Sequence, residues 1–65
     1  MIKNRIKELR AKNNITQLEL AKLVNVRRET IVFLEKGKYK PSLQLAYDVS
    51  KVFLSTIEEV FTFDQ

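Results

Sequence analysis

The segment 16–37, TQLELAKLVNVRRETIVFLEKG, carries the side chains best suited to contact with another molecule. Its second half opens with two arginines and continues with polar and apolar residues at outward positions: Arg27, Arg28, Glu29, Thr30, Val32 and Phe33. Paired N–H donors of arginine can bind guanine, and the neighbouring side chains can reach other base edges. A helix that presents this set on its outer side would fit the major groove of DNA.

Local signals predict the elements that position these residues. Thr16 is a suitable N-cap, and Glu19 three residues later completes a capping box, so a helix is predicted over 17–24. Asn25 tolerates the left-handed backbone conformation of a tight turn. A second helix is predicted over 28–36, and the glycine that follows ends it. The segment is therefore expected to form two helices joined by a tight turn.

The rest of the chain predicts three further helices and a single domain over 1–65. These helices span residues 4–13, from the Ser42 cap to about 53, and about 57–61 after Ser55 or Thr56. Pro41 keeps the basic loop 37–41 non-helical. Both chain ends, 1–3 and 61–63, alternate apolar and polar residues, so they can pair as a short two-stranded ribbon. The predicted fold is all-α, with five helices.

Composition limits the functions open to the chain. Its 65 residues include no Cys and no His, so no metal site or cofactor is expected. Catalysis would then need paired carboxylates or an activated lysine in a pocket, for which the chain has little room, and an enzyme is not expected. No apolar run reaches the ~20 residues of a membrane span, and the N-terminus lacks a signal-peptide core. The expected location is the cytoplasm.

The net charge of +4 is unevenly distributed. Residues 1–40 hold eleven Lys/Arg and four Glu, which gives +7, whereas residues 41–65 hold one Lys and four acids, which gives −3. A chain with one basic end can orient toward a polyanion such as DNA. A chance imbalance on a solvated surface is the alternative explanation.

Two other classes of function compete with DNA binding. A protein-binding module, such as an antitoxin or adaptor, would need a partner-binding extension for which this chain has almost no room. A membrane-surface peptide would need one continuous amphipathic helix, which Asn25, Gly37 and Pro41 prevent. The basic outer side of the predicted helix 28–36 favours DNA over both.

The ordered motifs IKELRAKNNITQLELAKLVNV and RRETIVFLEKGKYKPSLQLAYDVSKVF resemble those of the lambda-repressor-like, Cro-type helix-turn-helix domains, also called the XRE family. The resemblance covers nearly all of the chain and is closest to compact stand-alone regulators. It implies a homodimer that binds a palindromic operator in double-stranded DNA as a repressor, with helix 28–36 in the major groove. Since no ligand pocket is evident, an unidentified regulatory protein is the expected source of any signal.

Three residues depart from the family pattern. Asn25 stands where glycine is usual, and the turn is expected to survive because asparagine tolerates the same backbone. Arg27 stands where a small hydroxyl residue usually caps the helix, and arginine cannot accept a backbone N–H bond. Phe33 replaces a polar residue at a base-facing position. The fold is expected to tolerate these changes, whereas the operator sequence is expected to differ.

The resemblance and side-chain chemistry together assign roles to residues. Base contacts are expected from Arg28, Glu29, Thr30, Val32 and Phe33, and phosphate contacts from Gln17, Arg27, Lys38, Tyr39 and Lys40. Arg28 would bond guanine O6 and N7, while Glu29 would accept from cytosine N4 or hold Arg28 in place. Thr30 would reach a phosphate or a base. Phe33 would meet a thymine methyl or pack in the core, and Tyr39 would donate to a phosphate or pack under its loop.

Two further expectations concern structure rather than contact with DNA. Arg10 and Glu35 are expected to form a structural ion pair that ties the recognition helix to the body, and Arg10→Met to keep the fold while loosening DNA binding. The C-terminal segment is expected to form the dimer interface through its apolar side chains Ile57, Val60, Phe61 and Phe63. Phe61 or Val60 would serve the core while Ile57 and Phe63 face the partner; the alternative is that all four cap the core.

Overall fold

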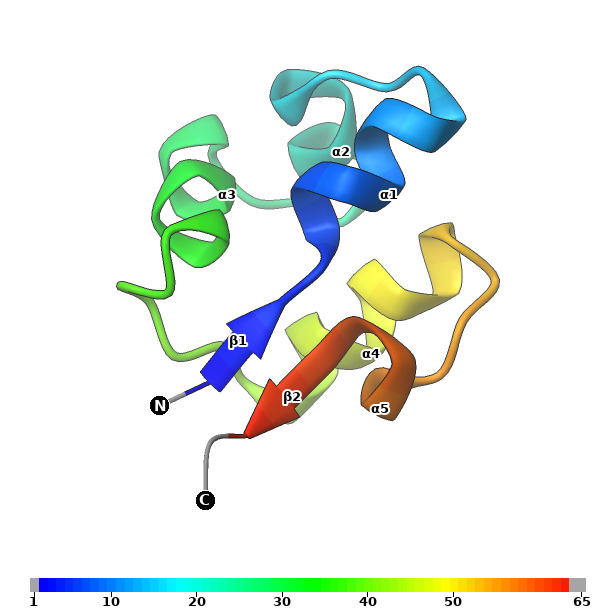
Figure 1. The fold of residues 1–65 in the computed structure, drawn as a ribbon. Helices are drawn as coiled ribbons and strands as arrows, with labels where there is room; N and C mark the ends of the chain where they lie inside the picture. The colour runs from blue at the N-terminus through cyan, green and yellow to red at the C-terminus, as the bar shows by residue number, and fades with distance from the viewer. Residues whose placement is uncertain (1, 64–65) are drawn as a thin grey trace.

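The computed structural model describes residues 2–63 as five helices and a two-stranded antiparallel ribbon (Figure 1). In chain order the elements are β1 (Ile2–Asn4), α1 (Ile6–Asn13), α2 (Gln17–Leu23), α3 (Arg28–Glu35), α4 (Leu43–Val52), α5 (Ile57–Val60) and β2 (Phe61–Phe63). The predicted five-helix fold and the ribbon of the two chain ends are both confirmed. The Met1 end of the predicted ribbon lies outside the described residues.

The ribbon sets the start of α1 and the end of α5. Ile2 pairs with Phe63 and Asn4 with Phe61, so Asn4 is a strand residue and α1 begins at Ile6, not at residue 4 as predicted. The Asn4 side chain donates to the carbonyl of Leu34 at 2.8 Å and accepts the N–H of Ile6 at 3.2 Å. One asparagine therefore joins the ribbon to the end of α3 and to the first turn of α1.

Three helices begin at a hydroxyl N-cap. The Thr16, Ser42 and Thr56 side chains each accept a backbone N–H three residues later. At Thr16 and Thr56 the box is complete, because Glu19 and Glu59 each accept the N–H of the capping threonine at 2.8 Å. This hydrogen bond from the backbone of the threonine lowers the pKa of each glutamate.

The capping boxes predict a pH dependence of stability. Because the folded pKa of Glu19 and Glu59 lies below the unfolded value of about 4.3, their stabilisation is complete above that value and is lost as pH falls through the folded pKa. Thermal melts at decreasing pH should therefore show a steeper loss of Tm in the wild type than in Glu19→Gln/Glu59→Gln. Glutamine can still accept the cap bond but does not titrate. Parallel curves for the two proteins would contradict this account.

Four helices end in the same way, at a residue with left-handed backbone. These residues are Asn14, Asn25, Gly37 and Leu54, with φ of 57°, 60°, 72° and 52°. After each one, the next N–H bonds a carbonyl five residues back, for example Val26 to Ala21 at 2.9 Å and Ser55 to Ser50 at 3.0 Å. This is the Schellman motif, in which glycine is the usual left-handed residue and asparagine the next choice. The expectation that Asn25 can make the turn is confirmed.

Leu54 is the exception among these four, and its conformation is costly. A left-handed leucine is strained by its β-carbon, and the side chain is 95% exposed, so packing within the protomer does not compensate. Leu54→Gly is therefore expected to raise the free energy of unfolding by about 1 kcal/mol. Leu54→Ala is the matched control, since it removes the exposed side chain but keeps the β-carbon. A gain in Leu54→Ala as large as in Leu54→Gly, measured by urea unfolding, would refute the strain.

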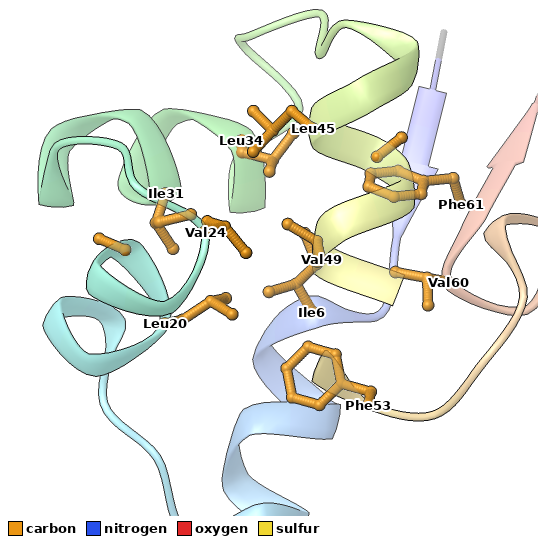
Figure 2. Packing of buried hydrophobic residues seen from close by; sticks show 12 residues of the cluster. Ile6, Leu20, Val24, Ile31, Leu34, Leu45, Val49, Phe53, Val60 and Phe61 are labelled. Carbon is orange, nitrogen blue, oxygen red and sulfur yellow. The ribbon is translucent and has the colours of Figure 1, made fainter. Parts of the chain in front are cut away.

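The core combines buried apolar side chains from all five helices with the Phe61 ring of the ribbon (Figure 2). Ile6 and Val49 are fully buried and lie near the centre of the cluster, between the α2–α3 pair and the C-terminal elements. Val60 and Phe61 are also buried and close the core beside β1. The last helix was predicted to end at Phe61, but it ends at Val60, and Phe61 is the first residue of β2. Within residues 2–63, none of the helices has the length and apolar character to cross a membrane.

Candidate nucleic-acid interface

The helix–turn–helix unit is held together by buried apolar residues of α2 and α3. Leu20, Ala21 and Ile31 are buried, and the turn folds back so that the N–H of Val26 donates to the carbonyl of Ala21 at 2.9 Å. The turn closes on Asn25, and the next extended residue, Arg27, is the N-cap of α3. Arg27 makes no side-chain cap among the described residues, as its chemistry predicts, and its guanidinium lies exposed at the start of α3.

The outer side of α3 is defined by the position of its buried side. Ile31 and Leu34 are buried, and the opposite stripe follows the spacing i, i+3, i+4, i+7. This stripe, which we call the outward stripe, consists of Glu29, Val32, Phe33 and Lys36. Phe33 is 48% exposed, so the alternative that it packs in the core is wrong. Arg28 is exposed beside the stripe, whereas Thr30 is half-buried toward the core side.

The predicted ion pair of Arg10 and Glu35 forms and is largely buried. Arg10 Nε and Nη2 donate to the two carboxylate oxygens of Glu35 at 2.6 and 3.1 Å, and the two side chains are 15% and 7% exposed. Arg10 Nη1 also donates to the carbonyl of Ile15 at 3.2 Å. Arg10 therefore ties α1 to the end of α3 and to the segment before α2.

Gln17 extends this pair to the start of α3. Its Nε2 donates to Glu35 Oε1 at 3.1 Å, and its Oε1 accepts from Arg28 Nη2 at 3.3 Å. The carboxylate of Glu35 requires a donor, so the amide must place its oxygen toward Arg28. Arg28 is thus held by Gln17 and not by Glu29, which was one sequence-based alternative. The sequence indicated Gln17 only as a phosphate contact, and its contacts with Glu35 and Arg28 were not foreseen. One N–H of Gln17 Nε2 binds Glu35, and these contacts also fix the orientation of the other N–H.

The loop that follows α3 gives a second cationic edge. Gly37 has the left-handed conformation that turns the chain, and Lys38, Tyr39 and Lys40 after it are all exposed. The loop lines a shallow groove of about 550 Å³ together with Ile2 and Phe63. The Tyr39 side chain borders this groove and is exposed, so it is not enclosed beneath the loop.

The predicted interface residues at the C-terminus divide into two pairs. One of Val60 and Phe61 was expected to serve the core, and both are buried there, so neither side chain is available to a partner. Their place in the predicted interface is corrected accordingly. Ile57 is half-buried and Phe63 is 69% exposed. Of the four predicted interface residues, Ile57 and Phe63 are the two whose side chains remain accessible.

Comparison with known proteins identifies the class. Residues 6–60 match the helix-turn-helix family HTH_3, so the chain belongs to the helix-turn-helix family. It is 66% identical over 64 residues to an uncharacterized HTH-type transcriptional regulator of Archaeoglobus fulgidus, covering 98% of this chain and 90% of that one. It is 42% identical over 64 residues to the uncharacterized HTH-type transcriptional regulator YgzD of Bacillus subtilis, covering 98% and 97%.

Solved structures agree with the fold. A protein from Bacteroides fragilis, described as a candidate DNA-binding protein, superposes with a TM-score of 0.83 and 26% identity, over 95% of this chain and all of that one. The clp gene regulator ClgR from Corynebacterium glutamicum superposes with a TM-score of 0.77 at 24% identity, over 83% of this chain and 57% of that one. The second likeness concerns the fold alone.

Proposed function

We propose that this chain is a sequence-specific, double-stranded-DNA-binding transcriptional regulator that inserts α3 into the major groove. The observation that carries the proposal is the combination of an exposed, chemically mixed outward stripe with a rigid attachment of the helix that bears it. A helix must protrude to enter the groove, and its orientation must be fixed for base contacts to discriminate. The names of the curated relatives support the same class.

Base reading is assigned to the first two turns of α3. Arg28 is placed to donate to guanine O6 and N7, and Glu29 to accept from cytosine N4. Phe33 offers an exposed ring to a thymine methyl, which explains a large aromatic on a basic surface. Val32 and Thr30 are half-buried and contribute at the two edges of this surface.

Phosphate binding is assigned to residues on both sides of α3. Gln17 and Arg27 border one side, and the loop residues Lys38, Tyr39 and Lys40 border the other. The second N–H of Gln17 is free to donate to a phosphate while the first holds Glu35. Such contacts fix the position of the protein on the duplex and make its affinity fall with salt.

Specificity further requires two copies, because one short recognition helix reads few base pairs. We assign the homodimer interface to Ile57 and Phe63. The dimer binds a palindromic operator, and binding to this operator represses transcription. Sedimentation at micromolar concentration should show a dimer, and a strictly monomeric species would contradict this interface. A cytoplasmic location and a separate protein that conveys any signal belong to the same proposal.

Selection of bound oligonucleotides from a random duplex pool tests the proposal as a whole. We expect enrichment of two inverted half-sites whose centres lie about one helical turn apart, roughly 10 base pairs. Recovery of a single half-site would support DNA binding but contradict the dimer. Absence of any enriched sequence would contradict sequence-specific regulation.

A further inference from the structure

A notch between α1 and α3 is lined by two lysines to which no DNA contact has been assigned. It has a volume of about 240 Å³ and lies where α1, the start of α2 and the end of α3 meet. Its lining residues are Lys7, Arg10, Gln17, Val32, Glu35 and Lys36. Val32 and Lys36 belong to the outward stripe, and Gln17 borders the notch, so the notch continues the surface assigned to DNA.

The charges of this notch do not cancel. Arg10 and Glu35 neutralise each other, because both carboxylate oxygens of Glu35 accept from Arg10 and one also accepts from Gln17. Lys7 and Lys36 are exposed, and neither side-chain ammonium has an ion pair or hydrogen bond within residues 2–63. Two positive charges therefore border a space whose centre is already electrically balanced.

Other acids near Lys7 are also engaged. Glu8, which is the single acid of α1, lines a neighbouring pocket together with Lys7, but its carboxylate binds the guanidinium of Arg5 at 2.6 Å. Glu35 Oε1 accepts two hydrogen bonds and Oε2 accepts one, so its charge is already shared between Arg10 and Gln17, and neither lysine of the notch bonds to it. The arrangement is suited to an external anion held between two ammonium groups and next to the free N–H of Gln17.

We infer that Lys7 and Lys36 together bind a DNA backbone phosphate adjacent to the one assigned to Gln17. This inference rests on the proposed function and deepens it, because it adds α1 to the surface that holds the duplex. The phosphate is favoured over an acidic protein because Lys36 lies one turn beyond Val32 and Phe33 on the outward stripe. A duplex seated on that stripe therefore passes over the notch.

The test is the salt dependence of binding to the duplex obtained by selection. Lys7→Gln, Lys36→Gln and the double variant are compared with wild type, and Lys12→Gln is the matched control from the same helix, outside the notch. Loss of one phosphate contact should lower the slope of log affinity against log salt by about 0.9, which at 0.1 M salt is roughly an 8-fold loss of affinity. The loss should be equal for matched and mismatched operators, since the contact reads no base.

Three outcomes would overturn the inference. One is an unchanged slope and affinity in the double variant, and another is an equal loss in Lys12→Gln, which would indicate a general charge effect. The third is a loss confined to one operator sequence, which would indicate base reading. Circular dichroism melts confirm that each variant is folded. Failure of the proposed function is distinguishable, because the wild type itself would then select no duplex.

Discussion

Arg10→Met is expected to lower the free energy of unfolding by about 3 kcal/mol, because it leaves the Glu35 carboxylate buried with Gln17 as its remaining side-chain donor. A domain of 65 residues has a total stability of roughly 3–10 kcal/mol, so this loss is a large share of it. The sequence-based expectation that Arg10→Met keeps the fold and loosens DNA binding stays a prediction, and the burial of Glu35 adds a loss of stability to it. Urea unfolding of the two proteins measures the difference.

The double variant Arg10→Met/Glu35→Met separates stability from positioning. Replacing both charges with apolar side chains removes the uncompensated carboxylate, so stability should return to within about 1 kcal/mol of wild type. DNA affinity should stay reduced, because Gln17 loses the partner that directs its oxygen toward Arg28. A double variant as unstable as the single one, or one with full DNA affinity, would contradict the role assigned to this network.

Arg28→Ala is expected to have the largest effect on recognition. Removing a bidentate donor pair costs about 1–3 kcal/mol of discrimination, so preference at one base pair of each half-site should fall by roughly 5- to 150-fold. The fold should be unaffected, because Arg28 is exposed and its bond to Gln17 is a long one of 3.3 Å. Selection from a random pool, repeated with the variant, shows which position loses its preference.

Arg27→Ala is the control for this experiment. Arg27 is also an exposed arginine at the start of α3, but it is assigned to phosphate. Its replacement should weaken binding about equally for all sequences and lower the salt slope by about 0.9. If Arg27→Ala relaxed specificity and Arg28→Ala did not, the two roles would have to be exchanged.

Much of the fold could be predicted because most helix boundaries carry local signals. Thr16 with Glu19 and Ser42 mark beginnings, while Asn25 and Gly37 mark ends, and these choices depend on neighbours within four residues. The ion pair of Arg10 and Glu35 was predicted by family resemblance, and the structure shows its geometry. Exposure of Arg28 followed from the position of the buried stripe on α3.

Features that depend on distant contacts were not predicted. Asn4 leaves the first helix because its side chain finds Leu34 across the fold, and no local signal specifies that bond. The orientation of the Gln17 amide depends on Glu35, which is 18 residues away in sequence. Only one of Val60 and Phe61 was expected in the core, because the sequence does not reveal how far a short C-terminal helix and the strand after it are covered; both side chains are buried.

The most direct test of the central claim is an NMR titration of the labelled chain with its selected duplex. The account predicts the largest backbone amide shift changes in Arg28–Phe33, with further changes at Gln17 and in the loop 38–40. Binding accompanied by changes confined to α4 and α5, with the α3 amides unmoved, would contradict the insertion of α3 into the major groove.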